Sequence, residues 1–260
     1  RVIDAFVRAH SFKNALNFHT YSNLLIYTLG DLSQERGDSL KFRDWTYDMT
    51  AVSRYRTGTD LQTVGYATRG NSDDYMYGDS TKPSVNAMTP EVGTSGFWPT
   101  VGEILPLAVE NLSPNKFLST AAGFLPRLRG FRILEADSNG SLSAGENFTL
   151  AAQMRNLGVG PAAGLSVEAS ADVPWVVFSP STVTVGPVPA QAAQEVLLQG
   201  MLDSLAPAAG QFRVFLRWLD TDGYAKQDTV HLYAGQPSLL FADSARTGTS
   251  NWSTGTGWGT

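Results

Sequence analysis

The chain has 260 residues, of which 42% are hydrophobic and 17% are charged, a composition typical of a globular protein with two or more cores. The formal net charge of −5 gives no electrostatic reason to expect nucleic acid as a partner, and no apolar run approaches the roughly 18 residues that span a bilayer. The absence of cysteine excludes disulfides and thiolate zinc sites, so any metal site has to use histidine and carboxylates.

The first elements have an α/β rhythm. Residues 1–12 have the spacing of the end of an amphipathic helix. Residues 15–19 form a short apolar segment that ends in a polar side chain, and residues 24–27 form a continuous apolar run typical of a buried strand. This order places His19 at the carboxyl end of a strand, where open α/β sheets bind their ligands.

The next hundred residues are less regular. A helix is predicted near residues 47–55, and residues 65–80 are so rich in Gly, Asn, Ser and Asp that they predict a long surface loop. Such loops carry function more often than packing. Residues 101–111 have the spacing of a helix that lies over a core, and residues 113–115 (Ser-Pro-Asn) are expected to end or interrupt it.

The pattern changes near residue 125 to short strands separated by Gly, Pro and Asn turns. Apolar and polar residues alternate after a Gly-rich turn at residues 137–140. Further strands are predicted at residues 176–178, 183–185, 195–198, 212–219 and 228–233. This spacing predicts an all-β sandwich over residues 126–235. Residues 236–260 are too few to bury a core, and we expect a linker and the start of a further β-rich module.

Glu91 is the carboxylate with the most suggestive surroundings. It lies in Thr89-Pro90-Glu91-Val92-Gly93-Thr94-Ser95-Gly96-Phe97-Trp98-Pro99, which Gly and Pro make rigid. A general base needs a carboxylate that is shielded enough for its pKa to approach the working pH, and we expect Phe97 and Trp98 to shield it. The ordinary alternative is a glutamate that caps a surface turn.

Two upstream segments join this one in a recognisable order. They read Asn17-Phe18-His19-Thr20-Tyr21-Ser22 and Gly65-Tyr66-Ala67-Thr68-Arg69-Gly70-Asn71-Ser72-Asp73-Asp74. Together the three segments resemble the zinc metallocarboxypeptidases of the carboxypeptidase A/B type, over about residues 1–123. The resemblance implies an α/β fold in which residues 1–125 are the C-terminal half of a mixed-sheet catalytic domain.

The resemblance also implies a role for each matched residue. His19 corresponds to the third zinc ligand, and Glu91 to the glutamate that activates the zinc-bound water and passes its proton to the leaving amine. Tyr66 corresponds to a mobile tyrosine that closes over the bound peptide, and Tyr21 is expected to bind substrate. Asp73 falls in the pocket for the C-terminal side chain, where an aspartate accompanies Lys or Arg specificity.

Ordinary structural interpretations of the same residues remain. A lone histidine beside an apolar run is often a hydrogen-bonded core residue, and a loop tyrosine often covers local apolar atoms. Asp73 and Asp74 are alternatively a solvated loop pair, with Asp74 as the structural partner. Some departures leave the pocket details open, since Tyr75 replaces the commoner tryptophan and no arginine directly follows Glu91.

One histidine does not make a zinc site, because catalytic zinc needs three protein ligands and an open position. The family supplies the other two from a His-x-x-Glu pair, but here the residues three positions after each histidine are Lys13, Ser22 and Ala234. The chain also opens on Arg1 with neither an initiator Met nor a signal peptide. We therefore expect an incomplete fragment that is inactive alone, with zinc as cofactor only in the intact enzyme.

The second half offers less chemistry. Asp137, Asn139 and Glu146 are potential calcium ligands, but their spacing is not that of an EF-hand, and such turns are common in sandwiches without metal. Residues 139–146 (Asn-Gly-x-Leu-x-x-Gly-Glu) resemble a stretch of the Ig-like domains appended to secreted bacterial hydrolases.

These observations predict a secreted or cell-surface bacterial metallocarboxypeptidase whose partners are peptide or protein C-termini. An alternative is a non-catalytic surface or interaction protein whose function resides in the β-modules. A further alternative is a component or cargo of an exported assembly, associated with export machinery or the cell surface.

Overall fold

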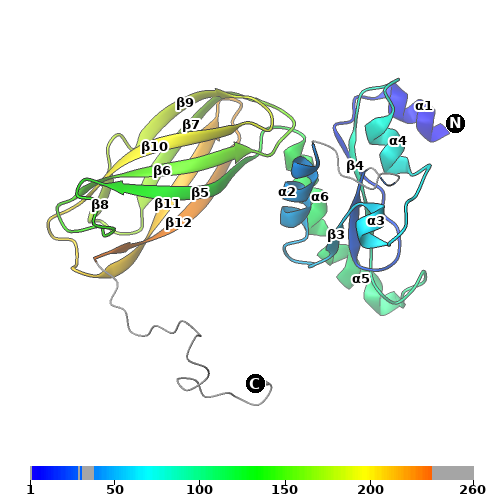
Figure 1. Cartoon of the computed structure of the whole chain (residues 1–260), viewed down its shortest axis with the longest axis horizontal. Coiled ribbons are helices and arrows are strands. Elements are labelled where there is room, and N and C mark those ends of the chain that lie inside the picture. Colours follow the sequence, from blue (N-terminus) through cyan, green and yellow to red (C-terminus); the bar gives the residue numbers. More distant parts are fainter. Residues whose placement is uncertain (1, 29, 31–37, 236–260) are drawn as a thin grey trace, which may run out of the picture.

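The structure is a computed structural model that describes residues 2–28, 30 and 38–235. Figure 1 shows an N-terminal unit of helices around a small sheet beside a larger unit made of strands. The predicted module at residues 236–260 lies outside the described residues. No helix in the described part of the chain has the length and apolar character needed to cross a membrane.

The N-terminal unit alternates helices and strands. Its elements are α1 (Val2–Ala9), β1 (Asn14–Leu16), β2 (Leu24–Tyr27), α2 (Ser39–Met49), β3 (Arg56–Gly58), α3 (Asp60–Thr63), α4 (Ser72–Gly78), β4 (Asn86–Glu91), α5 (Val101–Glu110) and α6 (Leu112–Ala121). The sheet has the order β1-β4-β2-β3 and is mixed, because β4 is parallel to β1 and antiparallel to β2, and β2 is parallel to β3.

Burial explains why these segments fold as they do. All four residues of β2 are buried, which accounts for its continuous apolar run. Helix α2 buries Phe42, Trp45 and Met49, which share one face because they are three and four positions apart. These side chains form one core with Leu25 and Met88 from the sheet.

Several predicted elements of this unit are corrected. The helix expected near residues 47–55 lies earlier, as α2, and ends at Met49. The loop expected at residues 65–80 gives way to helix α4 at Ser72, because two aspartates in the first turn suit a helix N-terminus. The helix at residues 101–111 exists as α5 but buries none of its residues. It ends before Asn111, and Pro114 lies in the first turn of α6, where proline is tolerated.

The second unit is a sandwich of two four-stranded sheets. Its strands are β5 (Pro126–Glu135), β6 (Asn147–Asn156), β7 (Ala162–Ala171), β8 (Val176–Phe178), β9 (Thr182–Val188), β10 (Ala193–Leu202), β11 (Gly210–Asp220) and β12 (Ala225–Ala234). One sheet has the order β5-β6-β10-β8 and the other β12-β11-β7-β9, with antiparallel neighbours throughout. Strand β7 is an addition to the predicted set.

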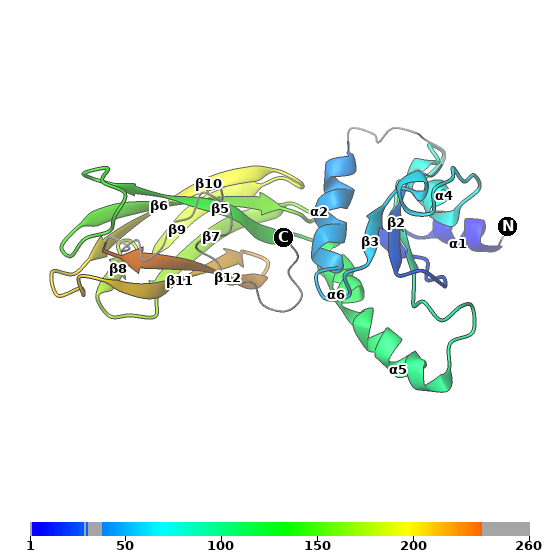
Figure 2. The same ribbon diagram turned by 60° about the horizontal axis from the view of Figure 1, so that its bottom comes forward.

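The two units share one tightly packed junction. Leu157 follows β6 but is fully buried in the core of the N-terminal unit, and its carbonyl accepts a hydrogen bond from Trp45 Nε1 (2.7 Å). Beside it, Arg127 of β5 pairs with Asp48 of α2 (2.8 Å). Figure 2 shows α2 lying between the sandwich and the small sheet, while α5 projects away from both. The change from helices to strands lies near residue 125, but the second unit contributes to the core of the first. The domain boundary at residue 125 therefore stays a prediction.

Candidate functional site

His19 and Glu91 meet at one edge of the small sheet. Glu91 is the last residue of β4, and His19 lies just beyond β1, which runs parallel to β4. The two residues form a parallel bridge, in which His19 N–H donates to Pro90 O and Val92 N–H donates to His19 O, both at 2.9 Å. Their side chains come within 4.0 Å, from Nδ1 to Oε1. Parallel strands thus bring together two residues that lie 72 positions apart in the sequence.

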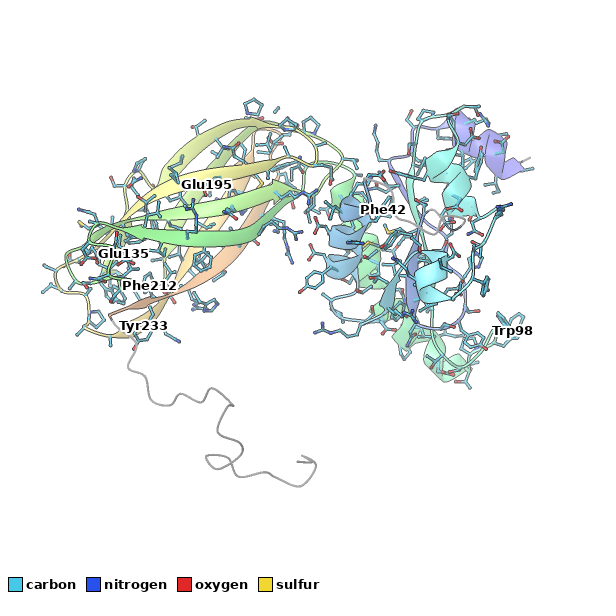
Figure 3. The ribbon with its side chains drawn as sticks, in the orientation of Figure 1. Phe42, Trp98, Glu135, Glu195, Phe212 and Tyr233 are labelled. Atoms are coloured by element: carbon cyan, nitrogen blue, oxygen red, sulfur yellow. The ribbon has the colours of Figure 1, made fainter. Side chains whose placement is uncertain are left out.

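The electrostatics of Glu91 suit a proton acceptor. Its side chain is 18% exposed, and burial raises the pKa of the carboxyl, with the positive contribution of His19 opposing the rise and Asp60 adding to it. The expected shielding by Phe97 and Trp98 is wrong, because both are exposed and Trp98 lies at the periphery of the molecule (Figure 3). The apolar residues of the cavity wall beside Glu91 are instead Ile26 and Val64.

A cavity of about 440 Å³ adjoins this pair. His19, Glu91, Tyr66 and Asp73 all line it. Tyr66 is 62% exposed and lies at the open side, whereas Asp73 is only 2% exposed. The structure therefore brings four of the five predicted site residues together.

Tyr21, the fifth, does not line this cavity. It packs against Phe97 edge-to-face with ring centroids 5.2 Å apart. It follows a Thr20–Tyr21 peptide bond that is cis. Backbone N–H groups of Ser22 and Asn23 donate to Gly93 O (2.8 and 3.1 Å), which ties the segment after Tyr21 to the segment after Glu91.

The carboxylate of Asp73 is held in a fixed place. Oδ2 accepts a hydrogen bond from Thr89 Oγ1 (3.2 Å), and Oδ1 accepts one from the Asp74 N–H (3.1 Å). Burial raises the pKa of Asp73. Asp74 has the structural role, because both of its oxygens accept the N–H of Gly30 at 3.1 Å. The two aspartates are therefore not a solvated pair.

Asp60 is a cavity residue that the sequence analysis missed. It opens helix α3, is 6% exposed and lines the same cavity. Asn71 Nδ2 lies 3.4 Å from its Oδ2, and burial raises its pKa. A carboxylate directly after Gly58-Thr59 is a typical helix start, so the local sequence signals a cap and gives no sign of the cavity.

The described residues do not by themselves form a zinc site. His19 has an exposed side chain (61%) at the mouth of the site and offers one imidazole nitrogen, but catalytic zinc takes three protein ligands. Within the described ranges, three possible metal ligands gather only at Glu135, Asp137 and Glu146, whose ligand atoms lie within 4.8 Å of one another.

That carboxylate group lies in the sandwich, where Figure 3 places Glu135 far from the small sheet. It contains two of the three residues considered for calcium. The third, Asn139, instead accepts the Ser141 N–H through its Oδ1 (2.8 Å). Glu135 and Glu146 also accept backbone N–H groups of the local turns, from Gly140 (2.7 Å) and Ser143 (2.8 Å).

Comparison with known families agrees with the motif resemblance. Residues 1–113 match the family model described as zinc carboxypeptidase. The match supports this family for the N-terminal unit, with hydrolase and peptidase character and zinc as the metal of its intact members. It covers β1, β4 and the whole cavity wall, and it stops within α6.

A search of curated proteins finds no match. Among solved structures, native alpha-2-macroglobulin from Escherichia coli, from domain MG7 to the C-terminus, is similar at 11% identity and a TM-score of 0.30, over 44% of this chain and 17% of that one. A FixG-related protein from Vibrio parahaemolyticus is similar at 10% identity and a TM-score of 0.27, over 40% of this chain and 94% of that one. The chain thus spans about a sixth of the first of these proteins. At such TM-scores the likenesses carry no functional information.

Proposed function

We propose that this chain is part of a zinc carboxypeptidase that releases C-terminal residues from peptides or proteins. The observation that carries the proposal is the meeting of His19, Glu91, Tyr66 and Asp73 around one cavity. These residues come from different elements, and it is the parallel β1–β4 pair and the cover of α3 and α4 that bring them together. The family match over residues 1–113 supports the same reaction class.

In this proposal Glu91 acts as the general base and then as the acid. Burial makes its carboxyl a better proton acceptor than an exposed glutamate, since its pKa is raised toward the working pH. Its Oε1 lies 4.0 Å from Nδ1 of His19, which supports a role beside a metal that His19 would hold. Zinc, when bound, polarises a water molecule and the substrate carbonyl.

The two other zinc ligands would come from outside this chain, because the sequence has no His-x-x-Glu pair and the described residues bring no group of three metal ligands together at His19. The chain alone is therefore expected to bind zinc poorly and to be inactive.

The remaining residues would position substrate. Tyr66, at the open side of the cavity, would close over the bound peptide, and Tyr21, beside Phe97, would contact it further out. Asp73, at the buried side, would receive the C-terminal side chain and favour Lys or Arg, because a buried carboxylate is stabilised by a cation and disfavours an apolar group.

The test uses the protein expressed from its full gene. One zinc per chain by elemental analysis, together with release of C-terminal residues from peptides ending in Arg, Lys, Phe or Leu, is expected. Glu91→Gln should lower kcat/KM by about 10²–10⁴-fold and leave the zinc content unchanged. Glu195→Gln, on the exposed surface of the sandwich, is the matched control and should have no effect. Full activity of Glu91→Gln would overturn the proposed role.

A non-catalytic interaction protein is the second candidate, and the observation that favours it is the single zinc ligand in the chain. Absence of both zinc and peptide hydrolysis in the same experiment would support it.

We also propose that the protein is exported and that the sandwich is an Ig-like spacer or binding arm. The support is the sequence of residues 139–146 and the two-sheet architecture. Recovery of the protein from culture medium or the cell surface is the expected result of fractionation, and recovery only from the cytoplasm would contradict it.

A further inference from the structure

The cavity beside Glu91 has two buried carboxylates in its wall. Asp60 lies at the start of α3 and Asp73 in the first turn of α4, and both are more than nine-tenths buried. None of the described residues that line the cavity is Lys or Arg. In the described part of the chain, neither aspartate takes part in an ion pair, although surface carboxylates such as Asp44 and Asp172 do.

Neither carboxylate is free to turn toward solvent. Asp73 is fixed by Thr89 and the Asp74 N–H, as described above. Asp60 lies beneath the loop that carries Thr68 and Asn71, with Asn71 Nδ2 3.4 Å from Oδ2. The backbone of Gly30 closes over it so tightly that a Cβ atom there would lie 2.2 Å from Asp60 Oδ2. The fold therefore holds both acids at the cavity.

Two nearby buried carboxylates without a cation are an unfavourable arrangement. Each loses hydration, and the charge of Asp60 also contributes to raising the pKa of Asp73. Their polar contacts are to neutral groups, which offset only part of this cost. A ligand that brings a positive charge into the cavity would relieve the repulsion between the two carboxylates and would supply the counter-charge that they lack.

We infer that Asp60 is a second specificity-determining residue, which together with Asp73 receives a cationic side chain in this cavity. A planar guanidinium presents N–H groups in several directions and can donate to two carboxylates from different helices, whereas an ammonium is a point charge. We expect a guanidinium to bind most tightly, an ammonium to bind less tightly, and neutral groups to bind much more weakly than either. The inference rests on the proposed function only in taking the guanidinium to be that of a C-terminal arginine.

The binding step can be tested on the 260-residue chain without catalysis. Butylguanidinium, butylammonium and the neutral isostere butylurea are titrated at neutral pH, and backbone amide shifts of Gly70, Asn71 and Thr89 are followed by NMR. Butylguanidinium should shift these amides saturably, and butylurea should not. Equal binding of butylurea, or shifts confined to other surfaces, would overturn the inference.

Substitutions then assign the effect to the two acids. Asp60→Asn and Asp73→Asn should each weaken butylguanidinium binding by about tenfold or more. Asp222→Asn, on an exposed turn of the sandwich, is the matched control and should change nothing. Retained binding in a folded Asp60→Asn variant would remove Asp60 from the site. If that variant does not fold, the comparison of butylguanidinium with butylurea on the unchanged chain decides.

Hydrolysis by the full-gene protein separates this inference from the proposed function. There, Asp60→Asn should lower the ratio of kcat/KM for peptides ending in Arg to kcat/KM for peptides ending in Leu by tenfold or more. Cation binding without hydrolysis would support the cavity as a cation-binding site and would contradict the proposed carboxypeptidase activity. Release of Leu or Phe in preference to Arg, with no cation binding, would support the carboxypeptidase activity and would overturn the inference about Asp60 and Asp73.

Discussion

Asp73 illustrates how a single buried carboxylate links the site to the stability of the fold. Its pKa is raised in the folded state by burial, relative to an ordinary value of 3.8. The folded protein therefore holds this proton more tightly than the unfolded chain does. Stability from this group is greatest at acid pH and is lost as the pH rises through the folded-state pKa.

This linkage gives a prediction with a definite sign. As the pH is lowered from 7 to 4.5, the free energy of unfolding of the unchanged protein, measured by urea denaturation, should rise relative to that of Asp73→Asn. Asp172→Asn is the control that should show almost no change in this range, because hydrogen bonds from the backbone N–H and side chain of Arg213 lower the pKa of Asp172 below its ordinary value of 3.8. A difference for Asp73→Asn that does not vary with pH would contradict the assigned burial.

Asn156 is a residue whose hydrogen-bonding capacity is fully used. Its Oδ1 accepts the N–H groups of Leu125 (3.1 Å) and Gly158 (2.9 Å), and its Nδ2 donates to Gly160 O (2.9 Å) and Pro189 O (3.0 Å). It is completely buried at the junction of the two units. An amide at this position therefore holds three chain segments together.

Replacing Asn156 by the similarly sized leucine would leave the buried N–H groups of Leu125 and Gly158 without their acceptor, and would also remove a donor to the carbonyl groups of Gly160 and Pro189. We expect Asn156→Leu to lower the free energy of unfolding by at least about 2 kcal/mol, measured by urea denaturation at neutral pH. Asn147→Leu, at an exposed position of the same strand, should change it by less than about 0.5 kcal/mol. Similar values for the two variants would show that the buried network is not important for stability.

At the same scale, the sequence predicts His19 and Glu91 better than it predicts Asp60. The first two lie in short motifs that resemble one family, and the model of that family matches residues 1–113. Asp60 shares the cavity wall with Asn71, 11 positions later, whose Nδ2 lies 3.4 Å from Asp60 Oδ2, and local sequence does not specify such a contact. Likewise the sequence around Trp98 does not reveal that its side chain is exposed.

Among the elements, α5 stands out because none of its residues is buried, although Val101, Ile104, Leu105 and Val109 are apolar. It begins with a capped turn, in which the Thr100 N–H donates to Glu103 Oε2 (2.8 Å). Local capping supports the helix, but packing does not, and most helix stability in proteins comes from packing.

Helix α5 should therefore exchange its amide hydrogens much faster than α2, whose Phe42, Trp45 and Met49 are buried. Hydrogen exchange followed by mass spectrometry on the 260-residue chain measures this directly. Leu105→Glu should also leave the free energy of unfolding within about 0.5 kcal/mol of its original value. Equal protection of α5 and α2 would show that something covers α5 in solution.

The elements also show where patterns in the sequence are informative. Strand β11 is predicted well, because buried and exposed residues alternate along it. Strand β7 (AAGLSVEASA) was missed because Ala, Gly and Ser weaken the same alternation. Strand β4 contains Pro90, which disfavours a central strand, and its pairing on both sides with β1 and β2 is a tertiary outcome.

For the whole molecule, the junction makes the two units depend on each other. Leu157 is covalently part of the sandwich but completes the core around Trp45 and Met49. Gln191 adds a second donor to the Leu157 carbonyl (2.8 Å), so the inserted loop is also fixed from the sandwich side. Asp44 of α2 pairs with Arg129 and Arg155 of the sandwich and extends the contact.

Leu157→Ala should lower the free energy of unfolding by about 2–5 kcal/mol through the cavity that it leaves. Its effect is expected first in the N-terminal unit: hydrogen exchange in α2 should accelerate, while exchange in β11 stays slow. Leu197→Ala, at a largely exposed position of β10, is the control and should change neither. Acceleration confined to the sandwich would contradict the shared core.

The same insertion limits how this protein can be recombined. A graft that joined the N-terminal unit to another carrier at residue 125 would look natural from the change in sequence pattern, but it would remove Leu157 and leave Trp45 Nε1 without its acceptor. Gly158 allows no bulkier substitute, since a Cβ atom there would lie 1.9 Å from Gly123 O. A chimera would have to carry residues 156–160, and the strands that hold them, along with the N-terminal unit.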